Sequence, residues 1–200
     1  MIRYECLELL AANMTDQLVV TSQSGQRIEW SHLSKHEGNL LVGMMGCAVG
    51  VGMGLALALP RRKVIVLDSD GSILLSLFNL PTLGNLQPKN LLVYVFDNGV
   101  YSGSRISYPT ATSGNTDLAA MARGAGIKNA ITIRDLAHFK REGLAALDRN
   151  ELAFFVCKVE ESLMHRDIPR PTTDLAENKY TFVRYLERTE GRPIPFVGRG

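Results

Sequence analysis

The 200-residue sequence has few cysteines, and this scarcity excludes two classes of protein. Its three cysteines, Cys6, Cys47 and Cys157, are odd in number, lie far apart and show no metal-ligand spacing. They argue against a secreted framework held by disulfides and against a zinc site. No long apolar stretch follows a basic segment at the start, so we expect no signal peptide, and a reducing cytoplasm fits best.

The sequence also lacks a strong excess of charge of either sign. Its formal net charge is +2, and Lys and Arg form no block in the first two thirds of the chain. Basic residues are denser from Arg166 to Arg199, but acidic residues are interspersed among them, which weakens the field they produce. We therefore expect no nucleic-acid partner.

One long uncharged stretch, residues 38–60, has to be weighed as a membrane span because basic residues follow it directly. Gly46, Gly50 and Gly54 repeat at a spacing seen in helices that pack in lipid. The stretch is unusually rich in glycine, however, and it runs into KVIVLD, the strand that a soluble α/β core would need next. We therefore expect a buried segment and no membrane partner.

Apolar runs that indicate strands alternate with helical patterns along most of the chain. The predicted strands are residues 16–22, 40–43, 63–68, 90–97, 131–133 and 152–160. The predicted helices are residues 2–13, 47–59, 72–86 with an interruption at Pro81, 117–124 and 135–148. A polar connection through Glu37 and a polar loop over residues 100–116 complete the pattern. Helical crossovers build parallel sheets, so we predict an α/β fold, a doubly wound parallel sheet with helices on both faces.

The pattern weakens from Ser162 onward. Prolines extend residues 168–174, and residues 177–188 have the pattern of one amphipathic helix. We predict a domain over residues 1–161 and a carboxyl-terminal extension over residues 162–200 that contacts a partner.

Polar residues follow two of the strongest predicted strands. In open α/β sheets ligands bind beyond the carboxyl ends of the strands. Asp70 offers a carboxylate, Asn98 an amide oxygen and the backbone around Val100 further oxygens, a ligand set that Mg²⁺ accepts. Gly71 permits close approach of a phosphate, and Ser72 begins a helix whose N–H groups attract an anion. Asp-Gly or Asn-Gly alone is usually a turn, but their pairing predicts a magnesium-diphosphate site.

These residues resemble the signature of thiamine diphosphate (ThDP, or thiamine pyrophosphate, TPP) enzymes. LDSDGS is followed by DNGVY with 25 residues between Gly71 and Asp97, similar to the family's Gly-Asp-Gly and Asn-Asn or Asp-Asn pair. The resemblance implies that Mg²⁺ is bound by the side chains of Asp70 and Asn98 and the backbone carbonyl of Val100. It also implies that the cofactor is held by Gly71, Ser72 and Tyr101. Ser69 stands where the family usually has its first glycine, and a required positive φ would strain it.

The glycine-rich segment LVGMMGCAVGVGMGLALALP is similar to the one that precedes this signature in ThDP decarboxylases. The resemblance implies that the Gly43 carbonyl receives the 4′-amino group of the cofactor and that Met45 holds the thiazolium ring in its bent form. Ordinary core filling is the alternative for Met45. A dinucleotide site is disfavoured because the glycines do not directly follow a first strand.

The resemblance also implies a partner. Full-length enzymes of this class have a pyrimidine-binding and a diphosphate-binding domain, and only the second is similar to this chain. A pyrimidine-binding (alpha) subunit would then supply the activating glutamate, in an α2β2 or larger assembly. The chain is similar along nearly its whole length to diphosphate-binding subunits of decarboxylases that act on acidic 2-oxoacids such as sulfopyruvate and phosphonopyruvate.

The expected activity is therefore decarboxylation of a small 2-oxoacid by a ThDP-dependent lyase. The second anionic group of such a substrate needs a cation, for which Arg105 is the candidate, and His36 is the candidate for proton transfer because it precedes the glycine segment. A carboligase half-subunit, similar to acetolactate synthase or transketolase, and a non-catalytic ThDP-binding domain remain as alternatives.

Overall fold

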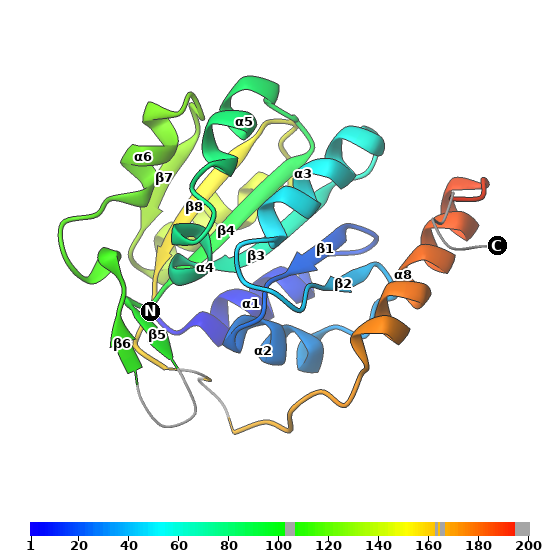
Figure 1. Cartoon of the computed structure of the whole chain (residues 1–200), viewed down its shortest axis with the longest axis horizontal. Coiled ribbons are helices and arrows are strands. Elements are labelled where there is room, and N and C mark those ends of the chain that lie inside the picture. The colour runs from blue at the N-terminus through cyan, green and yellow to red at the C-terminus, as the bar shows by residue number, and fades with distance from the viewer. Residues whose placement is uncertain (103–106, 163, 165–166, 195–200) are drawn as a thin grey trace.

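The computed structural model describes residues 1–102, 107–162, 164 and 167–194 (Figure 1). Within these residues, six parallel strands form the main sheet in the order β2-β1-β3-β4-β8-β7. The strands are β1 (Leu18–Thr21), β2 (Asn39–Leu41), β3 (Val64–Ser69), β4 (Leu91–Asp97), β7 (Ala130–Ile133) and β8 (Ala153–Lys158). The predicted parallel sheet is confirmed.

Helices cover both faces of this sheet, as the pattern predicts (Figure 1). One face carries α3 (Ala48–Ala58), α5 (Asn79–Leu86) and α6 (Leu118–Gly124). The other face carries α1 (Arg3–Ala12), α2 (Gly25–Leu33) and the helical turns α7 (Leu136–His138), η2 (Phe139–Leu144) and η3 (Ala145–Asp148). The chain is therefore a doubly wound α/β domain.

Burial on both faces explains why the central strands are continuous apolar runs. In β3, Val64 and Val66 pack with the helices on one face, whereas Ile65 and Leu67 pack with those on the other. All seven residues of β4 are buried in the same way. A strand covered on both faces needs apolar side chains at every position rather than at alternate ones.

Helix α2 is a correction, because the sequence pattern indicates only a polar connection there. Its inner face buries Ile28 and Trp30 but also Glu29. Glu29 forms a buried ion pair with Arg3 of α1, with 2.7 Å between Oε2 and Nε. A charged side chain on the buried stripe disrupts the apolar periodicity by which an amphipathic helix is recognised.

Two further segments differ from their prediction. The predicted helix over residues 72–86 is two helices, α4 (Asp70–Leu74) and α5, and the polar loop contains a hairpin. The hairpin pairs β5 (Val100–Ser102) antiparallel with β6 (Ser107–Pro109), and the short helix η1 (Ala111–Ser113) follows it. In Figure 1 this hairpin lies beside α4, at the end of the sheet where β3 and β4 end.

The predicted helix near the carboxyl terminus is α8 (Leu175–Glu190), which lies along β2 (Figure 1). Phe182, Tyr185 and Leu186 are buried in the same cluster as the strands. The side chain of Asn178 accepts a hydrogen bond from the Leu41 N–H at 2.8 Å and donates one to the Asn39 carbonyl at 2.9 Å. The amide of Asn178 therefore takes the place of a neighbouring strand and closes the open edge of the sheet.

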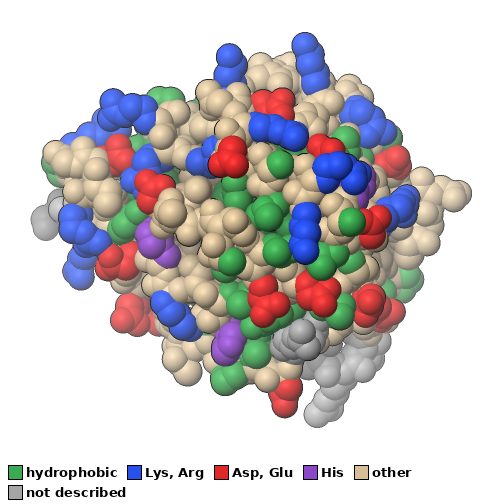
Figure 2. Space-filling view, turned by 180° about the vertical axis from the view of Figure 1, so that it is seen from behind, with side chains coloured by type: hydrophobic (Ala, Val, Ile, Leu, Met, Phe, Trp, Pro, Cys, Tyr) green, Lys and Arg blue, Asp and Glu red, His purple; other side chains and the backbone are tan. Residues whose placement is uncertain are grey.

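The surface has no dominant sign of charge on the face opposite to the view of Figure 1. Figure 2 shows Lys and Arg side chains interspersed with Asp and Glu on this face, with hydrophobic side chains between them. Among the described residues, no helix combines the length and hydropathy of a membrane span.

Candidate functional site

The strand order places the topological switch point of the sheet between β1 and β3. The chain passes from β1 to β2 on one side and from β3 to β4 on the other. The loops that leave two such strands diverge, and ligands of open α/β sheets bind at this point. Asp70 directly follows β3, and Asp97 ends the neighbouring β4.

The carboxylate of Asp70 is fully buried at this edge. Its Oδ2 atom accepts a hydrogen bond from Oγ1 of Thr110 at 2.6 Å and lies 2.9 Å from Oγ1 of Thr112. Its Oδ1 atom is buried without a hydrogen-bond partner among the described residues. Burial raises the pKa of the Asp70 carboxyl group, and the threonine hydrogen bonds oppose that rise. An unpaired buried carboxylate oxygen is costly and fits a bound cation.

The neighbouring carboxylate of Asp97 is buried but fully engaged. Its Oδ1 atom lies 2.8 Å from the Thr112 hydroxyl and accepts a hydrogen bond from the Gly99 N–H at 3.1 Å. Its Oδ2 atom forms an ion pair with Lys158 at the end of β8. Of these two carboxylates, Asp70 is the one with an oxygen to spare for a metal ion.

The turn after β4 carries the other predicted metal ligands. Gly99 has a φ of 74°, in the left-handed region that favours glycine. The Asn98 side-chain oxygen accepts a hydrogen bond from the Val100 N–H at 3.2 Å. The structure brings Asn98 and Val100 together in this turn, directly after the strand that neighbours Asp70.

Gly71 and Tyr101 are packed against each other. A Cβ atom added to Gly71 would lie 2.4 Å from Cε1 of Tyr101, so no other residue fits beneath this ring without a shift. The contact brings the hairpin, which begins at the turn with Asn98, onto the start of α4. Two predicted cofactor-binding residues are therefore neighbours in space, although they lie on different elements.

Ser72 joins α4 to the glycine-rich segment. Its buried hydroxyl accepts a hydrogen bond from the Gly46 N–H at 2.8 Å. Met45 is partly exposed beside this bond, and Gly43 lies against Leu175, whose Cδ1 would be 2.6 Å from an added Cβ. The structure thus ties the segment containing Gly43 and Met45 to the residues that follow β3.

Ser69 is not strained at the position where glycine is usual. Its φ of −122° and ψ of 159° are extended, so positive φ is not required. Its hydroxyl accepts a hydrogen bond from the Ser72 N–H at 3.4 Å and caps α4. The departure from the family pattern is compatible with this local structure.

A buried polar cluster behind Asp70 was missed by the sequence reasoning. Burial raises the pKa of Asp68, while hydrogen bonds with Ser22 and Ser72 act to lower it. Gln26 Nε2 donates to Ser22 Oγ at 2.7 Å. The polar run after β1 was visible in the sequence, but only the strand order places it next to β3.

His36 lies at the other end of the strands from Asp70. It precedes β2, so it belongs to the amino end of the parallel strands. The turns that carry Asp70 and Asn98, together called the cradle, follow the carboxyl ends. Its Nδ1 atom accepts a hydrogen bond from the Gly38 N–H at 3.1 Å, and its ring meets Tyr185 edge-on. The proton-transfer role of His36 stays a prediction. Arg105 lies outside the described residues.

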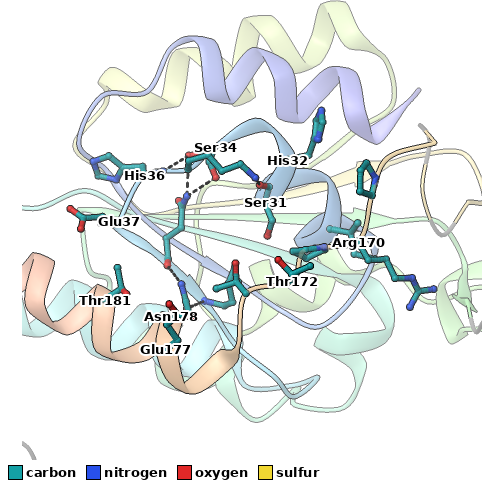
Figure 3. Close-up of a pocket in the computed structure, with 17 residues that line it drawn as sticks. Ser31, His32, Ser34, His36, Glu37, Arg170, Thr172, Glu177, Asn178 and Thr181 are labelled. Atoms are coloured by element: carbon teal, nitrogen blue, oxygen red, sulfur yellow. Dashed lines mark hydrogen bonds between the residues drawn. The ribbon is translucent and has the colours of Figure 1, made fainter.

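His36 instead lines a cavity of about 430 Å³ at the β2 edge (Figure 3). The cavity lies between α2, the loop before β2, residues 169–173 and the first turns of α8. Figure 3 shows Asn178 at its floor, with Ser34 and His36 on the opposite side. Asp70, Asn98 and Tyr101 do not line it.

The part of the chain that contains Asp70 and Asn98 also matches known proteins. The family described as "Thiamine pyrophosphate enzyme, C-terminal TPP binding domain" matches residues 22–157. The sulfopyruvate decarboxylase subunit beta of Methanocaldococcus jannaschii is 32% identical over 192 residues, which cover 94% of this chain and 98% of that protein. The phosphonopyruvate decarboxylase of Streptomyces viridochromogenes is 36% identical over 128 residues, 63% of this chain and 32% of that protein.

Solved structures share the fold. The benzoylformate decarboxylase from Polynucleobacter necessarius aligns with a TM-score of 0.64 at 18% identity, over 82% of this chain and 34% of that one. This chain therefore spans about a third of that structure, as it does of the phosphonopyruvate decarboxylase. The sequence match covers β2 to β8 and both polar turns described above.

Proposed function

Because this chain belongs to the family of C-terminal, TPP-binding domains of thiamine pyrophosphate enzymes, we propose that it is the diphosphate-binding (beta) subunit of a ThDP- and Mg²⁺-dependent decarboxylase. Its substrate would be an acidic 2-oxoacid such as sulfopyruvate or phosphonopyruvate. The observation that carries the proposal is the buried, unpartnered Oδ1 of Asp70 among the described residues, at the edge where this fold binds ligands.

The proposed Mg²⁺ ligands are Asp70, Asn98 and the backbone carbonyl of Val100. A carboxylate and two neutral oxygens leave the remaining positions of an octahedral ion to phosphate oxygens and water. Gly71 and Ser72 are proposed to hold the diphosphate, with Tyr101 beside them. The packing of Tyr101 on Gly71 supports this grouping because it brings the two turns together.

When bound, ThDP supplies the carbanion chemistry by which a 2-oxoacid loses CO₂. The residues of this chain would position that chemistry. Gly43 is proposed to offer its carbonyl to the aminopyrimidine, and Met45 to provide an apolar wedge for the thiazolium ring. The hydrogen bond from Gly46 to Ser72 supports this role because it holds the segment beside the diphosphate site.

A partner subunit completes the proposal. The pyrimidine-binding (alpha) subunit would supply the activating glutamate, in an α2β2 or larger complex. Apolar side chains that lie beside the cradle support a partner surface, since Met44 is 67%, Leu75 59% and Phe78 73% exposed. We also propose that the extension over residues 162–200, which follows the predicted domain of residues 1–161 and packs on it through α8, contacts this partner.

The proposed place of action is the cytoplasm. Cys6, Cys47 and Cys157 are free thiols, which supports a reducing compartment. A small-molecule 2-oxoacid needs a cation for its second anionic group, and Arg105 stays the candidate for this contact.

Calorimetric titration of ThDP and Mg²⁺ into the full chain, co-expressed with the pyrimidine-binding chain, tests the proposal. We expect saturable ThDP binding that requires Mg²⁺, followed by CO₂ release from sulfopyruvate or phosphonopyruvate. Absence of binding in the intact complex would contradict the cofactor assignment. Product analysis would separate an aldehyde-forming decarboxylase from a carboligase, and binding without turnover would favour the non-catalytic alternative.

A further inference from the structure

Two threonine hydroxyls hold one oxygen of the Asp70 carboxylate. Thr110 and Thr112 are both buried, and both lie within hydrogen-bond distance of Asp70 Oδ2, at 2.6 and 2.9 Å. Their hydroxyls are also 2.8 Å from each other. Both contacts are made to Oδ2, so this oxygen faces the threonines and Oδ1 is the oxygen that is available to a ligand.

Thr112 also reaches the second carboxylate of the site. Its hydroxyl lies 2.8 Å from Asp97 Oδ1, and Lys158 pairs with Asp97 Oδ2. A continuous row of polar contacts therefore runs from Lys158 through Asp97 and Thr112 to Asp70. The row begins on β8, crosses the end of β4 and ends at the start of α4.

The hairpin delivers both threonines to this position. Thr110 follows β6 directly, and its N–H donates a hydrogen bond to the Gly99 carbonyl at 2.9 Å. Gly99 in turn donates its N–H to Asp97. The turn that carries Asn98 and the threonines that contact Asp70 are therefore parts of one hydrogen-bonded unit.

We propose that Thr112 is a positioning residue, whose hydroxyl orients Asp70 so that its Oδ1 atom faces the metal ion. This inference rests on the proposed function of the site. Groups that hydrogen-bond to a metal ligand orient it, and their removal typically weakens metal binding by about 10- to 100-fold. Thr112 does not itself touch the metal; it acts through Asp70.

The decisive variant is Thr112→Val, which removes the hydroxyl and keeps the shape of the side chain. Thr112→Ser restores the hydroxyl and is the conservative rescue. Thr189→Val is the control, because Thr189 lies on α8 at the β2 edge of the sheet and its hydroxyl donates to the Tyr185 carbonyl at 2.9 Å. A purely structural role for Thr112 would change the melting temperature of the metal-free protein without changing metal affinity.

The experiment is a titration of Mn²⁺, followed by electron paramagnetic resonance, into the full chain in complex with its pyrimidine-binding partner at constant ThDP. We expect Thr112→Val to bind Mn²⁺ about 10- to 100-fold more weakly than wild type. Thr112→Ser and Thr189→Val should bind it as wild type does. If Thr112→Val does not fold, Thr112→Ala takes its place, with the same expected loss of about 10- to 100-fold.

The outcomes separate the two proposals. Tight Mn²⁺ binding by wild type and equal binding by the hydroxyl-free variant would overturn the role of Thr112 and leave the proposed function standing. Failure of wild type to bind Mn²⁺ with ThDP would overturn the proposed function, and the role of Thr112 with it. An equal loss of affinity in Thr112→Ser and Thr112→Val would also overturn the role of Thr112, because the hydroxyl would then not be the cause of the loss.

Discussion

At the β2 edge of the sheet, the side chain of Asn178 accepts a hydrogen bond from the Leu41 N–H and donates one to the Asn39 carbonyl. At the carboxyl ends of the central strands, which we call the carboxyl edge, the Oδ1 atom of Asp70 is buried and has no such partner in the described part of the chain. Both edges present polar groups that need partners. One is satisfied by the protein's own helix, and the other is left for a ligand.

The difference shows that the chemistry of unpaired atoms identifies this site better than the size of a cavity does. The cavity of about 430 Å³ lies at the β2 edge, where Asn39, Asn178 and His36 have hydrogen-bond partners. The hydroxyl of Ser31 is buried there without a partner in the described structure. An unpaired hydroxyl costs less than an unpaired carboxylate oxygen, so the carboxyl edge has the greater need of a ligand.

The largest effect should come from Asp70→Ala. We expect Mg²⁺-dependent ThDP binding to fall by more than about 100-fold, because a metal ligand is removed rather than merely misaligned. The free energy of unfolding of the metal-free protein should not fall, since the variant removes a buried carboxylate with an unpaired oxygen. Calorimetry measures the binding of ThDP, and urea unfolding measures the stability. A large loss of stability would contradict the view that Asp70 serves a ligand rather than the fold.

At the other edge, Phe182→Ala should have the opposite signature. Phe182 is buried where α8 meets the core, so the free energy of unfolding should fall by about 3–5 kcal/mol. Once folded, the variant should bind ThDP with wild-type affinity. Tyr180→Ala, at an exposed position on the same helix, should stay within about 0.5 kcal/mol of wild type in the same urea titration. An equal loss in both variants would argue against the docking of α8 described above.

Asn178→Ala tests the closed edge directly. It removes both hydrogen bonds to β2, and we expect a loss of about 1–3 kcal/mol in the free energy of unfolding. Asn150→Ala, at an exposed position in the loop before β8, serves as the control and should change it little. Hydrogen exchange at the Leu41 amide should quicken in the first variant alone, and unchanged exchange there would contradict the strand-like role of Asn178.

The smallest effect should come from Ser69→Gly. Ser69 has an extended backbone, so glycine relieves no strain. The replacement of a capping serine by glycine lowers the free energy of unfolding by only about 0.3 kcal/mol. ThDP affinity should stay unchanged. A marked gain in affinity would show that the serine is a defect in the cradle, as the non-catalytic alternative requires.

The central strands and both polar turns could be predicted from the sequence because their signals are local. β3 and β4 are unbroken apolar runs, and Asp70 and Asn98 directly follow them. The direction of parallel strands then places the two turns at one edge. The same rule, applied to β2, would have placed His36 at the opposite end.

Contacts between distant parts of the chain could not be predicted. Helix α2 is obscured because Glu29 on its buried face pairs with Arg3, 26 positions away. Thr112 contacts Asp70 across 42 positions, through a hairpin of polar residues that has no strong strand signal. Such pairs depend on the tertiary fold, so the side chains that contact Asp70 could be found only from the structure.

The most direct test of the account is a crystal structure of the complex of this chain and its pyrimidine-binding partner with ThDP and Mn²⁺, in which anomalous scattering locates the ion. The account predicts the ion about 2.1 Å from Oδ1 of Asp70, with Oδ2 still bound by Thr110 and Thr112. An ion coordinated by Asp97, or by neither carboxylate, would contradict it.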